Sequence, residues 1–139
     1  FSGIRFKVGL SETANTANPN LVPTNHPLFF DEGEMYFNAD SGYVFNRIEL
    51  LENTLLVDTT IVDTTLIEIG LNENLRNIVL DYPFSLSLGF NTSIILQIDY
   101  RDWFELIDFQ NDSPSTIVTK IMENLPNSFD IAAIETSVN

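Results

Sequence analysis

A succession of short apolar runs, each bounded by turn-forming residues, indicates that this chain folds mainly as β-strands. The first run, at residues 4–10 (IRFKVGL), places three apolar side chains on one face and Arg5 and Lys7 on the other. Such alternation is typical of a half-buried strand. Further strands are predicted from residue 42 onward and at residues 53–62, 64–71, 77–82, 84–90 and 93–100. The strands at 53–62 and 64–71 are predicted to form a hairpin that turns near Asp63.

Helical signals are confined to the region near the C-terminal end. Residues 101–107 (RDWFELI) predict a short helix, with Asp102 as its cap and three apolar residues on one face. A second helix is predicted to follow, with Ser113 as its N-cap and Pro114 at its first position. An apolar stripe runs along this helix until Pro126 ends it.

These elements together predict an all-β fold, an antiparallel β-sandwich with a short helical segment near the C-terminal end. Residues 129–134 are predicted to form a closing strand. The length of 139 residues suits one domain, residues 1–139. Because the first strand begins at Ile4 and a strand needs partners, we expect further strands upstream of it.

Charge and composition restrict the classes of partner. The formal net charge is −14 and only six residues are basic, whereas a nucleic-acid surface needs clustered lysines and arginines. The absence of cysteine removes disulfides, thiolate metal sites and cysteine nucleophiles. No apolar run approaches the roughly 20 residues of a transmembrane helix. We therefore expect no nucleic-acid partner and no transmembrane segment in this chain.

Candidate metal ligands gather in residues 25–49, which include the only histidine, His26. Imidazole suits copper or zinc, and the thioether of Met35 suits Cu(I). Carboxylates from Asp31 and Glu34 could complete a site. The alternatives stay open: His26 as an ordinary loop residue, Met35 as part of the core, and the acidic run as a solvated turn or a calcium ligand set.

Aromatic residues of the same segment are candidates for contact with an organic ligand. Tyr36 and Tyr43 could stack on a sugar or a peptide, although such rings more often pack in a sandwich core. No nucleophile elbow, phosphate-binding glycine loop or zinc-protease motif is present. Asp99 at a strand end and Asp102 as a helix cap account for these acids without catalysis. We expect a protein that is not an enzyme.

Three blocks of the sequence, in order, resemble the MbnP-like family of bacterial secreted or lipid-anchored β-sandwich proteins. The blocks are FSGIRFKVGLSETAN, NHPLFFDEGEMYFNADSGYVFNRIE and IILQIDYRDWFEL. Within them the residues that match the family pattern are Val8-Gly9, Met35, Tyr36, Ser41, Gly42, Tyr43, Phe45, Glu49, Asp99 and Trp103-Phe104. The resemblance covers the later part of the family domain, which has several strands upstream of Ile4.

The resemblance implies a non-enzymatic lipoprotein or secreted protein of the periplasm, outer membrane or cell surface, with copper or another metal as its ligand. This sequence departs from the copper-binding members because Phe37 and Ala39 replace the two tryptophans of the central block. Copper ligation derived from an oxidised tryptophan therefore does not carry over. The alternative is a structural or adhesive module that pairs with a protein partner in the cell envelope.

Overall fold

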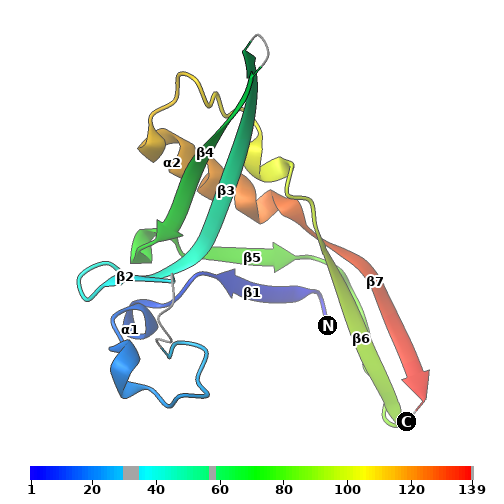
Figure 1. Cartoon of the computed structure of the whole chain (residues 1–139). Helices are drawn as coiled ribbons and strands as arrows, with labels where there is room; N and C mark the ends of the chain where they lie inside the picture. The colour runs from blue at the N-terminus through cyan, green and yellow to red at the C-terminus, as the bar shows by residue number, and fades with distance from the viewer. Residues whose placement is uncertain (30–34, 57–58, 139) are drawn as a thin grey trace. The chain divides into compact units, whose positions relative to one another are not determined.

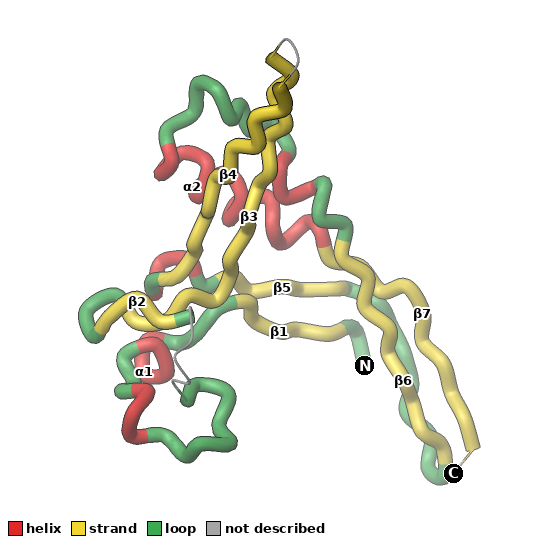
Figure 2. Tube along the Cα trace, in the orientation of Figure 1, coloured by secondary structure: helices red, strands yellow, loops and turns green. Residues whose placement is uncertain are grey.

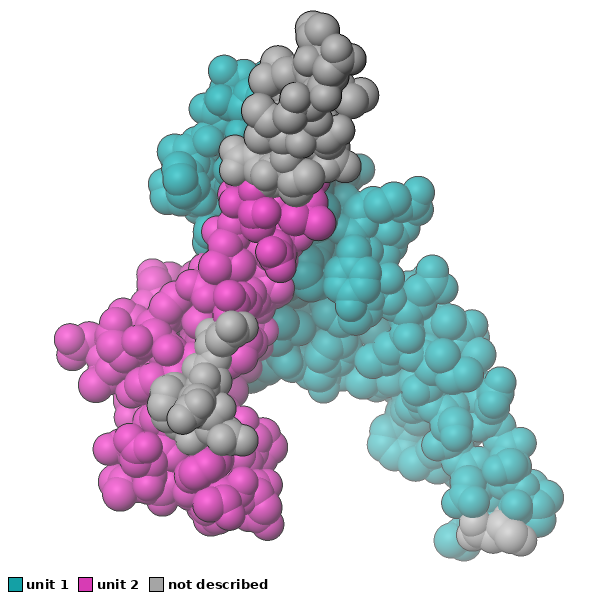
Figure 3. Space-filling model, in the orientation of Figure 1, with its two compact units in different colours: residues 1–8, 76–139 teal, residues 9–75 magenta. Residues whose placement is uncertain are grey.

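The computed structural model describes residues 1–29, 35–56 and 59–138, and their side chains except those of residues 52–63. The chain divides into two compact units (Figure 3). Unit 1 comprises residues 1–8 and 76–139, and unit 2 comprises residues 9–75. Each unit has its own strands and its own buried side chains, and each is described by itself below.

Unit 1 contains two antiparallel strand pairs (Figure 1). β1 (Ile4–Val8) pairs with β5 (Arg76–Leu80), and β6 (Phe90–Ile98) pairs with β7 (Phe129–Val138). Between β6 and β7 the chain forms the short 3-10 helix η3 (Asp102–Phe104), α2 (Pro114–Asn124) and the 3-10 helix η4 (Leu125–Ser128). The ring of Phe6 in β1 meets that of Phe129 in β7 edge-on, with centroids 5.2 Å apart. This contact joins the two strand pairs.

The predicted second helix, α2, is confirmed at its first residue. Ser113 Oγ accepts a hydrogen bond from the backbone N–H of Thr116 at 3.2 Å, and Pro114 begins the helix. Proline is tolerated there because the first backbone N–H groups of a helix have no partner within the helix. The apolar stripe is buried, with Ile121 and Met122 fully inside the unit.

The helix predicted at residues 101–107 forms only as a short 3-10 helix. Only the single turn η3 forms, and Asp102 lies inside it instead of capping it. Leu106 has a φ of 59°, which a right-handed helix cannot accommodate. Trp103 is nevertheless buried as expected of an apolar face, and its Nε1–H donates to Ser128 Oγ at 2.7 Å.

Unit 2 is built on one three-stranded antiparallel sheet, in the order β2-β3-β4 (Figure 2). The strands are β2 (Tyr36–Asn38), β3 (Gly42–Leu56) and β4 (Thr59–Gly70). Its short helical turns are α1 (Glu12–Asn15), η1 (Pro19–Leu21) and η2 (Asn72–Asn74). The register of β3 on β4 shifts between Val44 and Asn46, so Phe45 is the extra residue of a bulge.

Two strand predictions need correction. The hairpin does not turn near Asp63, which lies within β4 opposite Glu52, and β3 instead extends to Leu56. Residues 84–90 alternate in the sequence but form no strand before Phe90. Phe84 is held elsewhere in unit 1, where its ring stacks on Phe1 and its carbonyl accepts from the amino terminus at 2.8 Å. In both places alternation is present, but the pairing partner decides where the strand lies.

The predicted fold class is confirmed. The described chain is mainly β, every strand pairing is antiparallel, as in a β-sandwich, and α2 lies near the C-terminal end. Strands β1, β5, β6 and β7 correspond to predicted strands. None of the helices in the described part of the chain has both the length and the apolar character to cross a bilayer.

Candidate functional site

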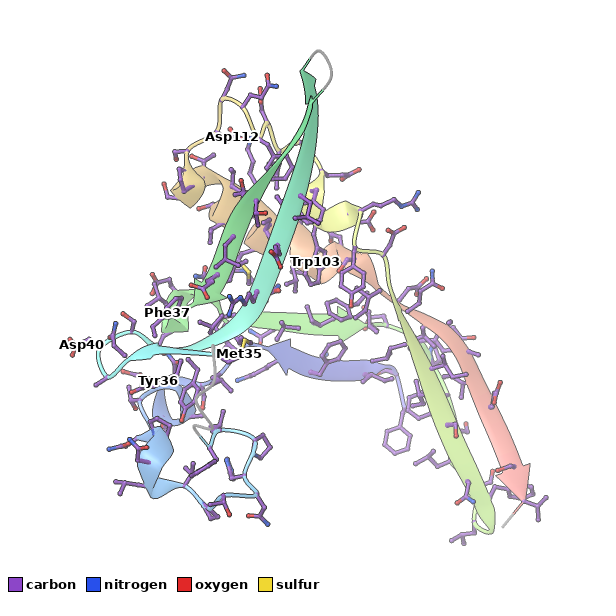
Figure 4. The ribbon with its side chains drawn as sticks, in the orientation of Figure 1. Met35, Tyr36, Phe37, Asp40, Trp103 and Asp112 are labelled. Atoms are coloured by element: carbon purple, nitrogen blue, oxygen red, sulfur yellow. The ribbon has the colours of Figure 1, made fainter. Side chains whose placement is uncertain are left out.

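Three of the candidate residues, Met35, Tyr36 and Tyr43, lie in or directly before the hairpin formed by β2 and the start of β3, and Figure 4 labels Met35 and Tyr36 there. Tyr36 lies opposite Tyr43 in the antiparallel register, and the turn between them is closed by a side chain. Asn38 Oδ1 accepts from the backbone N–H groups of Asp40 and Ser41 at 2.9 and 2.8 Å. An asparagine that bonds its own following backbone is a typical turn device. The sequence Asn-Ala-Asp-Ser thus brings the two tyrosines together.

Asn15, at the end of α1, holds this hairpin in unit 2. Its side chain is only 4% exposed, and its Oδ1 accepts the buried backbone N–H of Tyr43 at 2.8 Å. Its Nδ2 donates to Asn72 Oδ1 at 3.0 Å and to the Ser41 carbonyl at 3.5 Å. Gly42 is required beside it, because its φ is +74° and a Cβ there would lie 2.5 Å from the Asn15 carbonyl oxygen. One buried amide therefore connects three separate stretches of unit 2.

Tyr43 is buried, and its ring packs against the ring of Tyr36. It is 5% exposed, and its hydroxyl donates to the Leu28 carbonyl at 2.8 Å. Burial, followed by the neighbouring Tyr36 hydroxyl, raises the pKa of Tyr43 above its ordinary value. The two rings meet edge-on with centroids 4.9 Å apart, an attractive geometry. Of the two predicted ligand-binding residues, Tyr36 lines a surface hollow and Tyr43 is buried; contact of either residue with a ligand stays a prediction.

That hollow is a concavity of about 270 Å³ in unit 2. Besides Tyr36 it is lined by Thr16, Asn18, Pro19, Asn20 and Ala39. None of these five residues is among those predicted from the sequence to form a site. The signal was the Asn-Pro pair: Asn18 Oδ1 accepts from the Asn20 backbone N–H at 3.0 Å, which starts the turn η1.

Met35 is presented to solvent instead of being buried. It is 44% exposed, while its backbone carbonyl accepts from the Val44 N–H at 3.0 Å. The other methionine, Met122, is fully buried in α2. Phe37, which stands where the family has tryptophan, lies against Gly70; a Cβ on this glycine would be 2.7 Å from the phenyl ring. The thioether of Met35 is thus an accessible soft donor directly before β2.

His26 is exposed and hydrogen-bonded within its own turn. Its Nδ1 accepts from the Leu28 backbone N–H at 3.1 Å, which places the proton of a neutral ring on Nε2. The predicted ligands Asp31 and Glu34 lie outside the described residues. Within residues 1–29, 35–56 and 59–138, no group of three or more histidine and carboxylate side chains is arranged to hold a metal. The predicted four-residue metal set is therefore untested as a set.

The carboxylates of unit 1 are engaged in loop structure. Asp99 accepts from the backbone N–H and the Nε of Arg101 at 3.0 and 3.1 Å. These hydrogen bonds lower the pKa of Asp99 to about 2. Asp112 pairs with Lys120 at 2.6 Å, and this contact is the main cause of the lowered pKa of Asp112. Both arrangements anchor the chain before and after η3.

Comparison with known protein families gives a match over most of the chain. A family model described as MbnP matches residues 1–122, from before β1 to within α2. Neither the search of curated proteins nor that of solved structures found a significant match. The matched stretch contains Asn15, the β2–β3 hairpin and Trp103.

Proposed function

This chain belongs to the MbnP family, and on that premise we propose that it is a non-enzymatic protein acting outside the cytoplasm, in the periplasm or at the cell surface. Its proposed activity is to bind copper or another soft metal ion through Met35, which lies directly before β2. A screen against common hydrolase substrates tests the non-enzymatic part, and turnover that a heat-unfolded sample lacks would contradict it.

The exposed thioether of Met35 is the observation that supports the metal proposal. An unbranched apolar side chain gains about 2 kcal/mol from full burial, so leaving it 44% exposed gives up much of that gain. The backbone of Met35, directly before β2, is fixed by the hydrogen bond that its carbonyl accepts from the Val44 N–H. Thioether sulfur prefers soft monovalent copper over hard cations.

His26 is the second proposed ligand, through its Nε2. Binding there requires the proton to leave Nε2, and a proton on Nδ1 would face the Leu28 N–H. The hydrogen bond would then be lost at a cost of about 1 kcal/mol. That is small beside the affinity of a transition-metal site, so the turn opposes ligation only weakly. Asp31 and Glu34 remain the proposed carboxylate ligands, with zinc as the alternative metal.

The experiment uses the two methionines as separate reporters. Protein labelled with ¹³C at the methionine methyl groups gives one signal for Met35 and one for Met122. We expect Cu(I), or Ag(I) as a redox-inert substitute, to shift the Met35 signal at one equivalent and to leave the Met122 signal in place. Competition against a coloured Cu(I) chelator measures the affinity.

Substitutions complete this test. Met35→Leu keeps the volume and removes the sulfur, so it should abolish tight Cu(I) binding, whereas His26→Ala should weaken it. Met122→Leu is the matched control, since that side chain is fully buried. Equal shifts of both methionine signals, or unchanged affinity in Met35→Leu, would remove Met35 from the site. Absence of any saturable binding would end the metal proposal and leave the family assignment intact.

Pairing with a protein partner is the second candidate function, favoured by the β6–β7 ribbon. In the part of the chain that the structure describes, β6 and β7 pair only with each other. A two-stranded ribbon is marginal in water by itself. Phe90, Ile95 and Leu96 on β6 are 46, 43 and 42% exposed. Unpaired strand edges beside exposed apolar side chains are typical of surfaces that accept another strand.

The absence of cysteine allows a clean test of this alternative. A photo-crosslinker attached at Ser93→Cys, in β6, is compared with one at Thr119→Cys, on the exposed side of α2. In native envelopes we expect the ribbon position to give one defined protein adduct and the helix position to give none. Identical adduct patterns from both positions would contradict a specific role for the ribbon.

A further inference from the structure

Two basic side chains share the exposed face of the β1–β5 pair in unit 1. Arg5 and Lys7 alternate with buried-side residues along β1, and both are exposed. In the antiparallel register Arg5 lies opposite Val79, and Lys7 lies opposite Asn77. Val79 is 50% exposed. The face therefore presents two cations, one amide and one apolar side chain.

These two cations differ from the other four basic residues. Each of the others is engaged: Arg47 with Glu68, Arg76 with the Met122 carbonyl, Arg101 with Asp99, and Lys120 with Asp112. Among the described residues, Arg5 and Lys7 have neither an ion pair nor a side-chain hydrogen bond. On a chain of net charge −14, this face holds positive charge that no carboxylate of the described chain neutralises.

The same residues border a concavity of about 330 Å³. It is lined by Arg5, Phe6, Lys7, Asn77, Ile78 and Val79. Residues two apart on a strand lie roughly 7 Å from each other, because each residue advances about 3.4 Å. Two carboxylates at alternate positions of an extended peptide have that same spacing.

We propose that this face binds an acidic, extended peptide segment of a partner protein, with carboxylates at alternate positions facing Arg5 and Lys7. This inference specifies a surface and a partner chemistry for the protein-pairing alternative above and rests on it, but it is independent of metal binding. A nucleic acid is not the proposed occupant, because its binding needs a larger cluster of lysines and arginines than the two cations of this face.

A protective role is the competing explanation, since charged residues on an edge strand suppress aggregation. The two explanations predict different consequences of removing the charges. If the charges are protective, their removal should promote self-association. If they form a binding face, their removal should weaken the affinity for the peptide, and the protein should stay monomeric.

The test uses a fluorescein-labelled peptide, Ser-Glu-Val-Glu-Val-Ser, and fluorescence anisotropy with the full chain. At about 0.15 M salt the screening length is roughly 8 Å, so the local cations act with little influence from distant carboxylates. The double variant Arg5→Gln with Lys7→Gln is compared with Arg47→Gln and Arg101→Gln combined. Both double variants remove two positive charges, which changes the net charge from −14 to −16.

We expect the Kd to rise about tenfold in the Arg5/Lys7 variant, as for the loss of two exposed ion pairs, and to stay within about twofold in the control. A peptide with adjacent glutamates should bind more weakly than the alternating one. Equal loss in both variants, undiminished binding of a glutamine version, or no saturable binding to the wild-type chain would overturn the proposal. Self-association of the Arg5/Lys7 variant with unchanged peptide affinity would establish the protective role instead. None of these outcomes affects crosslinking from the β6–β7 ribbon, so the two proposals fail separately.

Discussion

Replacing Asn15 by alanine should destabilise unit 2 more than its single side chain suggests. The substitution leaves the Tyr43 N–H without its acceptor in a buried position, where an unpaired donor costs about 1–3 kcal/mol. Loss of the bond to Asn72 Oδ1 adds about 1 kcal/mol. The Ser41 carbonyl, at 3.5 Å, contributes little. We therefore expect a loss of about 2–4 kcal/mol, a large part of the 5–15 kcal/mol that holds a typical domain.

Substitution of Asn15 by aspartate tests the accepting role of the side-chain oxygen separately from the donating role of the side-chain nitrogen. The carboxylate keeps the acceptor for Tyr43 but can no longer donate to Asn72 Oδ1, and it is 4% exposed at this position. Burial raises the pKa of the new carboxyl in the folded state above its unfolded value. The folded state then binds a proton more tightly, so this variant should recover stability relative to wild type as the pH falls toward 4.

Urea unfolding followed by far-UV circular dichroism measures the free energy, and hydrogen exchange of the Tyr43 amide locates the effect. Asn20→Ala is the matched control in the same unit, because Asn20 is exposed and its change should stay within about 0.5 kcal/mol. The reasoning would be refuted if Asn15→Ala were no more harmful than Asn20→Ala. Unchanged protection of the Tyr43 amide would refute it equally.

Three further predictions concern backbone strain, a buried hydrogen bond and acid. Gly42→Ala should cost about 1–3 kcal/mol more than Gly89→Ala by urea unfolding, because both glycines have positive φ but only Gly42 has atoms within 3 Å of a new Cβ. Ser128→Ala should destabilise unit 1 by about 1–3 kcal/mol, since it leaves the buried Trp103 Nε1–H unpaired. The fluorescence of Trp103, the only tryptophan of the sequence, measures this unfolding, and Ser137→Ala, at an exposed position, is the control. Asp99 has a pKa lowered to about 2, so its contribution to stability is present above about pH 4 and is lost as the pH falls toward 2. An Asp99→Asn variant should therefore show a shallower acid transition of the Trp103 fluorescence. An identical transition in the variant and the wild type would contradict this assignment.

Local patterns of the sequence predicted the elements whose determinants lie within a few residues. Ser113 and Pro114 specify the start of α2 because a helix cap needs only the next turn of chain. The alternation at Ile4–Val8 specifies β1 because period two distinguishes its faces without reference to a partner. The three motif blocks indicated the MbnP family, and the match to residues 1–122 confirms it.

Features that depend on distant partners could not be predicted in this way. The turn near Asp63 and the strand at residues 84–90 were wrong because register is set by the paired strand or by contacts such as that of Phe84 with Phe1. Burial of Asn15 depends on hydrogen-bond partners up to 57 positions away, at Tyr43 and Asn72. The backbone of Met35 is likewise held by a residue nine positions away, Val44. Periodicity and capping are short-range properties of a chain, whereas burial, exposure and unpaired charge arise only when residues far apart in the sequence pack together. The candidate sites of this protein depend on burial, exposure and unpaired charge, so the tertiary structure was needed to find them.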